Sequence, residues 1–202
     1  ALVGGVGRDA GRSYVSLGAA ALDDIAGRDI VALPEDRALQ VAEYVADTRA
    51  PEVVDVSVNM TAETIALRFS EAVNVSTLQA DALVVQVAGN MSASGGGGAE
   101  YVLSGAAGAA WSRDQESVVV SLLKEDVDAI KVLEPLLTSA GTAFVRHSDG
   151  LVEDVFGVGI EAVGAERGLG VSAFGADEVA PEMTAFSIDM DTAILTINFS
   201  EP

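Results

Sequence analysis

The feature that most constrains this chain is a repeat at a constant spacing along the sequence. Ala50-Pro51-Glu52 returns as Ala180-Pro181-Glu182, and Phe69-Ser70-Glu71 returns as Phe199-Ser200-Glu201 (181 − 51 = 199 − 69 = 130). Residues 11–71 align with residues 141–201 without a gap, and nineteen of these sixty-one positions are identical. A constant spacing without insertions indicates one structural unit that is copied in tandem.

The phase of the repeat predicts the domain organisation. We expect residues 1–47 to be the closing strands of one repeat, residues 48–177 to be a complete repeat, and residues 178–202 to be the opening strands of the next. Pro51 and Pro181 stand at the two junctions, where a residue without a backbone N–H interrupts regular structure. The two end segments each carry part of a unit, so we expect a segment of a longer array.

Hydrophobic alternation predicts the fold of the complete repeat. Residues 54–58 and 64–70 alternate apolar and polar side chains, which is the period of a half-buried strand. Further strands are expected at residues 83–87, 100–103, 118–122, 142–146 and 169–174. Residues 124–133 predict one short helix with acidic residues in its first turn and Pro135 beyond its end. This pattern favours an all-β chain of Ig-like β-sandwich repeats of about 130 residues, with one short helix per unit.

Charge excludes some partners. The chain has 31 acidic and 11 basic residues, for a net charge of −20. Such a surface repels phosphate, so we expect no nucleic acid and no anionic membrane surface as a partner. The sequence has no apolar run of the roughly 18 residues that a membrane span requires, so we also expect no membrane insertion in this segment.

Several of these segments resemble a known family. Asp47–Glu52, the alternating strand after it and Leu67–Val73 resemble the opening of the bacterial-type Ig-like repeats of S-layer and surface proteins. Leu151–Gly157 resembles the turn near the end of that domain, and Asp126–Lys131 is similar to a helix in very large multi-repeat surface proteins of algae and related protists. The resemblance implies a β-sandwich used as a spacer, stalk or scaffold, and it brings no catalytic residues.

Asparagine supplies the second signal. All four asparagines of the chain stand in Asn-x-Ser/Thr motifs, at Asn59, Asn74, Asn90 and Asn198. This motif is the acceptor for N-linked glycans in proteins that pass through a eukaryotic secretory route. Asn198 lies between Ile197 and Phe199, so alternation places it on the outer face of a strand. We therefore expect covalent N-glycans at these four sites and an extracellular or cell-surface location.

Other chemistry has less support. Calcium binding is an open alternative, with Asp47, Glu52 and Asp154 as candidate oxygen ligands near a domain junction. The chain has no cysteine and a single histidine, His147, which aligns with Leu17 of the other copy. No metal ligand set, nucleophile or acid–base pair is marked strongly enough to predict an enzyme. Trp111, the single tryptophan, is expected to pack in the core or a turn.

The sequence therefore predicts a structural protein. We expect a component of a secreted, N-glycosylated filament, stalk or surface coat, in which neighbouring repeats or subunits stack or complement each other's strands. The partners in this interpretation are other copies of the unit. The alternative is a calcium-dependent adhesin or a glycan-binding surface module.

Overall fold

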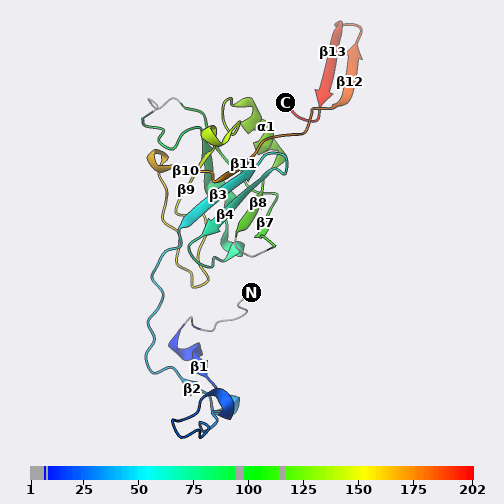
Figure 1. Cartoon of the computed structure of the whole chain (residues 1–202). Helices are drawn as coiled ribbons and strands as arrows, with labels where there is room; N and C mark the ends of the chain where they lie inside the picture. The colour runs from blue at the N-terminus through cyan, green and yellow to red at the C-terminus, as the bar shows by residue number, and fades with distance from the viewer. Residues whose placement is uncertain (1–6, 8, 94–97, 114–116) are drawn as a thin grey trace. The chain divides into compact units, whose positions relative to one another are not determined.

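The structure is a computed structural model of the chain, and it describes residue 7 and residues 9–93, 98–113 and 117–202 (Figure 1). The chain divides into two compact units, Ala1–Thr48 and Arg49–Pro202. Of the described residues, 34% are in strands or β-bridges and 16% in helices, so the expected β-rich fold is present. Single 3₁₀ turns connect many of the strands, at Ala10–Arg12, Ala19–Ala21, Glu35–Arg37, Val75–Thr77, Ala80–Ala82, Ala140–Thr142 and Ala165–Arg167.

The first unit contains one short antiparallel ladder. Strand β1 (Tyr14–Val15) pairs with β2 (Leu39–Gln40), and an isolated bridge joins Leu17 to Leu33. A second bridge closes the turn between Asp23 and Asp29. The second unit contains each of these pairings again at the equivalent positions of the repeat, so the sequence repeat is also a repeat of backbone structure.

The second unit is built on two larger sheets (Figure 1). The first has the order β11-β3-β4-β8-β7 and the second the order β10-β9-β5-β6. Their strands are β3 (Val53–Asn59), β4 (Thr64–Phe69), β5 (Leu83–Gln86), β6 (Glu100–Val102), β7 (Gly108–Trp111), β8 (Val118–Ser121), β9 (Phe144–His147), β10 (Leu169–Gly170) and β11 (Ala173–Gly175). The described pairings are antiparallel except that of β11, which runs parallel to β3.

The two sheets share one hydrophobic core. Alternate residues of β3 and β4 are buried, and Val56, Val58 and Leu67 are at most 2% exposed. The same buried cluster includes Val85 of β5 and Val145 of β9. The period-two pattern in the sequence is therefore the pattern of side chains that enter this core.

Helix α1 (Lys124–Val132) is the α-helix of the described residues and closes part of the core. Val127 and Ile130 lie three residues apart on one face, and both are fully buried. Glu125 and Asp126 stand in the first turn and Lys131 in the last, an order that complements the helix dipole.

A second hairpin follows the complete repeat. Strand β12 (Met183–Asp189) pairs with β13 (Ile194–Phe199) as a separate two-stranded sheet. These strands are the counterparts of β3 and β4 in the next copy of the repeat, and the register is the same in both pairs, including a bulge near the first residue.

The structure differs from the sequence-based expectation in two places. Strand β7 lacks apolar alternation in its sequence Gly-Ala-Ala-Trp and was not predicted. The strand expected at residues 169–174 is divided into β10 and β11, because the chain crosses from one sheet to the other at Val171 and Ser172. The Val171 amide donates to Ala143, just before β9, and the Ser172 amide donates to Val56 on β3 of the other sheet.

Candidate functional site

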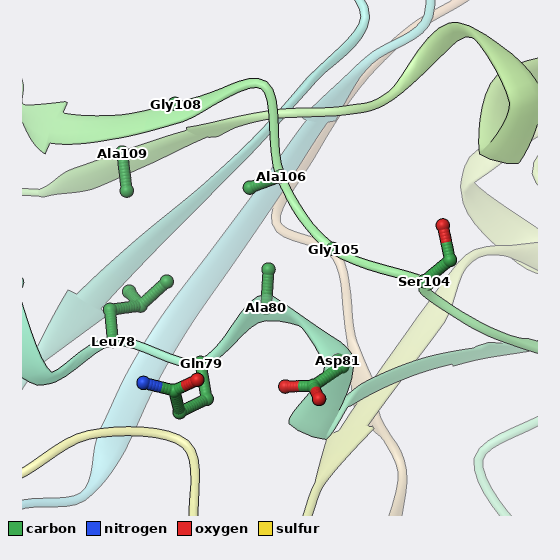
Figure 2. A pocket seen from close by; sticks show the side chains of 9 residues that line it. All are labelled: Leu78, Gln79, Ala80, Asp81, Ser104, Gly105, Ala106, Gly108 and Ala109. Atoms are coloured by element: carbon green, nitrogen blue, oxygen red, sulfur yellow. The ribbon is translucent and has the colours of Figure 1, made fainter.

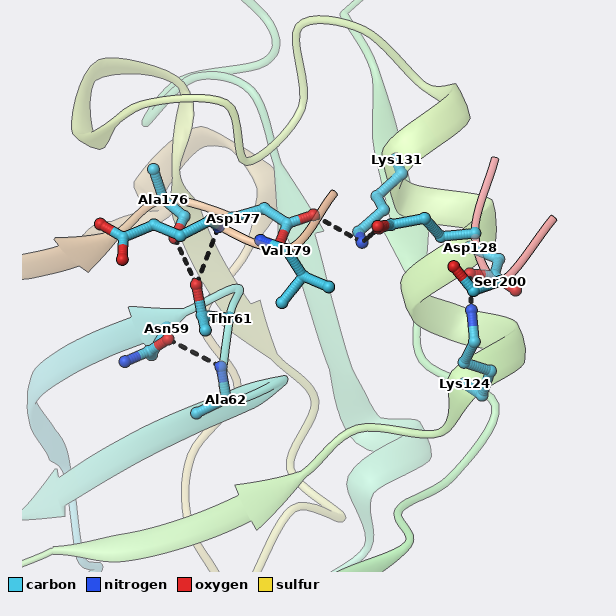
Figure 3. Close-up of polar contacts among 12 residues, drawn as sticks. Asn59, Thr61, Ala62, Lys124, Asp128, Lys131, Ala176, Asp177, Val179 and Ser200 are labelled. Atoms are coloured by element: carbon cyan, nitrogen blue, oxygen red, sulfur yellow. Dashed lines mark hydrogen bonds and ion pairs between the residues drawn. The ribbon is translucent and has the colours of Figure 1, made fainter. Parts of the chain in front are cut away.

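An ion cluster joins the complete repeat to the segment that begins the next one (Figure 3). Lys131 on α1 contacts the carboxylates of Asp177, at 2.6 Å, and Glu201, which lies just beyond β13. The side chains are 16%, 27% and 9% exposed, respectively. The ammonium group is therefore largely removed from water and neutralised by two carboxylates, an arrangement in which the loss of one partner is costly.

The pKa values agree with this cluster. Burial alone would lower the pKa of Lys131, but the hydrogen bonds and charges of Asp177 and Glu201 raise it overall. The hydrogen bond from Lys131 lowers the pKa of Asp177, and the Val179 amide adds to this effect. Lys131 and Asp177 are thus held in their charged forms at neutral pH.

Hydrogen bonds attach the same junction to the turn between β3 and β4 (Figure 3). The Thr61 hydroxyl donates to the carbonyl of Ala176 at 2.9 Å and accepts from the amide of Glu178 at 3.0 Å. The Met60 amide donates to the carbonyl of Gly175 at 2.8 Å. The chain that leaves β11 therefore has fixed neighbours on both sides of Asp177.

The four sequons occupy different environments. Asn59, Asn90 and Asn198 are exposed, and Asn74 is partly buried. In three cases the side-chain oxygen also accepts a local amide hydrogen: Asn59 from Ala62, Asn74 from Ser76 and Asn90 from Ala93. Asn198 lies on β13, as expected, but its apolar neighbours on that strand are exposed as well.

Two of the sequon asparagines are replaced by other residues at the equivalent position of the other copy of the repeat. Asn59 corresponds to Asp189, and Asn198 corresponds to Arg68. Asp189 accepts hydrogen bonds from the amides of Asp191 and Thr192, so it holds the same turn as Asn59 does in its own hairpin. The amide side chain is thus not required for the fold at that position, which leaves it available for modification.

The three calcium candidates differ in their burial and hydrogen bonding. Asp47 belongs to the first unit and is partly buried. Glu52 is exposed, and its amide donates to the Ser70 hydroxyl at 3.0 Å. Glu52 belongs to no cluster of three metal-ligating side chains among the described residues. Asp154 is 1% exposed, and its role is set by the turn that contains it.

Asp154 organises a turn that occurs twice in the chain. One carboxylate oxygen accepts from the amides of Phe156, at 2.8 Å, and Val158, at 2.7 Å. Gly157 follows with a φ of +92°, which disfavours any side chain there. Asp24 accepts from Ala26 and Arg28 in the same way, and Gly27 has a φ of +72°. The family-like turn in the sequence is thus explained by its backbone geometry.

One oxygen of Asp154 remains available. Its Oδ2 atom is buried and accepts no hydrogen bond from the described residues. A buried carboxylate oxygen that accepts no hydrogen bond offers a ligand atom to a cation.

A shallow groove of about 380 Å³ lies beside β7 (Figure 2). Its lining consists of Leu78, Gln79, Ala80, Asp81, Ser104, Gly105, Ala106, Gly108 and Ala109. Asp81 is the charged residue of this set, and the set contains no histidine, lysine or arginine. The lining therefore offers no histidine or lysine to activate Ser104 and no cation to stabilise an anionic transition state.

The single histidine and the single tryptophan of the chain lie in different environments. His147 is 2% exposed at the end of β9, and its Nδ1 atom lies 3.1 Å from the Ser148 carbonyl. Burial lowers the pKa of His147, while the Ser148 carbonyl opposes this shift. Trp111 is 38% exposed on the edge strand β7. It therefore lies outside the core, where we had expected core or turn packing.

Two polar residues were missed or misassigned. Asp126 stands in the first turn of the helix, as expected, but it is also fully buried and accepts from the Tyr101 hydroxyl, at 2.9 Å, and the Ser104 amide. Nothing in the sequence around Lys131 marked it as a site residue. Its two partners were marked by the repeat, because Asp177 and Glu201 occur again as Asp47 and Glu71 in the other copy.

No protein-family model matches this chain, and no curated protein or solved structure matches it significantly. The described residues include no helix with the length and apolar character of a membrane span.

Proposed function

We propose that this protein is a structural component of a secreted, N-glycosylated extracellular filament, stalk or surface coat that is built from Ig-like repeats. The observation that carries the proposal is the junction cluster of Lys131, Asp177 and Glu201. It connects the helix of one repeat to the linker and to the opening hairpin of the next. A spacer needs fixed contacts between consecutive repeats, because a flexible linker would let the array collapse.

The arrangement of polar groups supports the same role. Buried polar residues such as Asp126 and Asp154 hold loops and turns through backbone amides. The groove beside β7 lacks a convergent catalytic set. The sequons lie mainly on exposed positions, where glycans would coat a chain that is 50% hydrophobic.

The proposal is tested by secretion from a eukaryotic host behind an added leader. Intact-mass measurement before and after endoglycosidase treatment should show glycan on most of the four asparagines. Small-angle scattering of the secreted chain should give an elongated particle whose maximum dimension does not change with moderate salt. Bare asparagines together with a compact or widely variable particle would contradict the proposal.

A cation-dependent surface module is the second candidate. It is favoured by the buried Oδ2 atom of Asp154, which accepts no hydrogen bond from the described residues. Calorimetric titration with calcium tests it, and the matched control is the Asp154→Asn variant. A calcium-dependent rise in melting temperature that the variant loses would favour this candidate over a purely structural role.

A further inference from the structure

The aspartate turn at Asp154 and its counterpart at Asp24 differ at one carboxylate oxygen. In the first copy, Asp24 Oδ2 accepts from Arg28 Nε at 2.8 Å and lies 2.7 Å from Arg28 Nη2. The residue at the position of Arg28 in the second copy is Val158, which has no charge. The Oδ2 atom of Asp154 is buried and accepts no hydrogen bond from the described residues. This oxygen therefore binds a cation in one copy, while the side chain that supplies the cation is missing from the other.

The rest of the turn is the same in both copies. In each, the Oδ1 atom of the aspartate accepts from the amides two and four residues later. A glycine with a positive φ follows at the same place in each turn. The hydrogen bonds to Oδ1 therefore hold the carboxylate in the same way, and the two copies differ in the side chain that faces Oδ2 rather than in the turn itself.

A second carboxylate lies beside Asp154. An antiparallel bridge joins Val73 to Asp154. The Asn74 amide also donates to the Glu153 carbonyl at 2.9 Å, so the segment after β4 is fixed against the turn. Glu71 stands at the start of this segment, and one of its carboxylate oxygens lies within 4.8 Å of one from Asp154. Both acids belong to the second unit, so its own backbone holds the pair together.

Two carboxylates at this separation are stabilised by a cation between them. Asp154 is 1% exposed, so bulk water does not compensate its charge, and a neighbouring carboxylate adds like-charge repulsion. Oxygen ligands without histidine or cysteine favour calcium or magnesium over zinc and copper. Magnesium retains several of its water molecules, for which a buried carboxylate leaves little room, so the pair suits calcium better. The net charge of −20 also raises the local concentration of cations.

We propose that Glu71 and Asp154 bind a calcium ion, which takes the place that the guanidinium of Arg28 has in the first copy. The Oδ1 atom of Asp154 continues to hold the turn, and Oδ2 is the ligand. Calcium takes about six to eight oxygens, so backbone carbonyls and water complete the set. With two acidic ligands, the dissociation constant should be about 0.1–1 mM, as in extracellular modules. The inference rests on the cation-dependent candidate function above and specifies its binding site.

Titration of the full chain with calcium chloride tests the site, and magnesium chloride at equal ionic strength is the comparison. Calorimetry should give a calcium dissociation constant in the stated range. The melting temperature should rise by about 3–6 °C at roughly ten times that constant, because calcium binds the folded state alone. Magnesium should give less than about a third of this rise. No calcium binding up to about 10 mM, or an equal rise with magnesium, would overturn the proposal.

Neutral variants of the two acids identify the ligands. Glu71→Gln and Asp154→Asn should each weaken calcium binding by about tenfold or more, because each removes a charged ligand and keeps the size of the side chain. Glu153→Gln is the matched control, since Glu153 is exposed in the same turn and belongs to no metal-ligating cluster among the described residues. If Glu71→Gln kept the calcium response and Asp154→Asn lost it, the cation-dependent candidate would stand and this pair would be wrong.

The variant Val158→Arg gives the second turn the arginine of the first. Its guanidinium should occupy the Oδ2 atom of Asp154, raise the melting temperature without calcium and abolish the further rise with calcium. Val158→Gln, which has similar length and no charge, should keep the calcium response. Calcium binding by Val158→Arg with the parent affinity would overturn the proposal, and this test holds even if Glu71→Gln does not fold. If the glycans and the elongated particle are found but calcium has no effect, the filament function stands and this site fails.

Discussion

The hairpins β3–β4 and β12–β13 have the same local structure in opposite environments. Val53 pairs with Phe69 and Met183 with Phe199, and a bulge follows within two residues in each. Glu63 and Ala193 both have a φ of 54° in the connecting turn. The inner residues of the first hairpin are buried, however, whereas those of the second are exposed.

This difference shows which properties of a hairpin depend on its own residues and which depend on distant residues. Register, bulge and turn follow from residues within the hairpin, because they are present whether or not a core covers it. Burial follows from residues far along the chain that supply the second sheet and α1. A two-stranded hairpin without such a partner is only marginally stable in water.

Removal of one inner side chain from each hairpin should give the largest contrast. Leu67→Ala should lower the free energy of unfolding by about 2–5 kcal/mol, because Leu67 is fully buried and the change leaves a cavity. Its counterpart Ile197→Ala should change it by less than about 0.5 kcal/mol. Urea denaturation followed by the fluorescence of Trp111 measures both.

The measurement must be made at a protein concentration where the chain is monomeric. Equal losses for the two variants would mean that the second hairpin contributes to a core, and the comparison would then be wrong.

The two aspartate turns give the next contrast. Asp154→Ala should destabilise the second unit by about 2 kcal/mol, because two amides lose a charged acceptor in a buried position. Asp24→Ala should affect only its own turn, since the Asp24 side chain is 40% exposed and water can replace it. Amide hydrogen exchange distinguishes these outcomes, and global acceleration in Asp24→Ala would contradict them.

The ion cluster decides how firmly the second hairpin is held. Lys131→Met should leave Asp177 and Glu201 without their cation and loosen the junction by about 1–2 kcal/mol. Proteolysis within residues 176–182 should then become about tenfold faster, since about 1.4 kcal/mol corresponds to a factor of ten. Lys124→Met is the matched control, because Lys124 pairs with Asp128 on the exposed side of the same helix. Equal cleavage rates in the two variants would remove the junction argument.

The sequence predicted the parts of the fold that depend on alternation and failed where distant residues decide. Most strands and α1 were located, since apolar residues at period two or on one helix face identify them. Strand β7 and the division of β10 from β11 depend on pairing partners that have no local signature. The burial of Asp126 could not be predicted, because its partners, Tyr101 and Ser104, are far from it in the sequence.

The candidate sites also differ in whether a local sequence pattern identifies them. The sequons and the turn of Asp154 are short motifs and were visible in the sequence. The contact of Lys131 with Asp177 and Glu201 joins segments that are distant in the sequence, and only the repetition of the two acids marked it. The proposed function and the calcium alternative remain predictions.

The smallest expected effect concerns pH and compares His147 with Leu17, its counterpart in the other copy. His147 bridges to Val163, and Leu17 bridges to Leu33 in the same geometry. Burial holds the pKa of His147 in the folded state below its ordinary value. The unfolded chain therefore binds more protons in the interval between the folded pKa and about 6.5, so stability decreases as the pH falls through that interval.

The variant His147→Leu takes the residue of the other copy and should remove this dependence. Above about pH 6.5 its free energy of unfolding should lie within about 1 kcal/mol of the parent, because both side chains fill the same position. Below that pH the parent should lose up to about 1.4 kcal/mol per unit of pH, while the variant stays level until the carboxylates titrate. Denaturation curves between about pH 5 and pH 8 measure the slope. Parallel slopes would show that the imidazole gains a proton in the folded state without cost, against the effect that burial has on a cation.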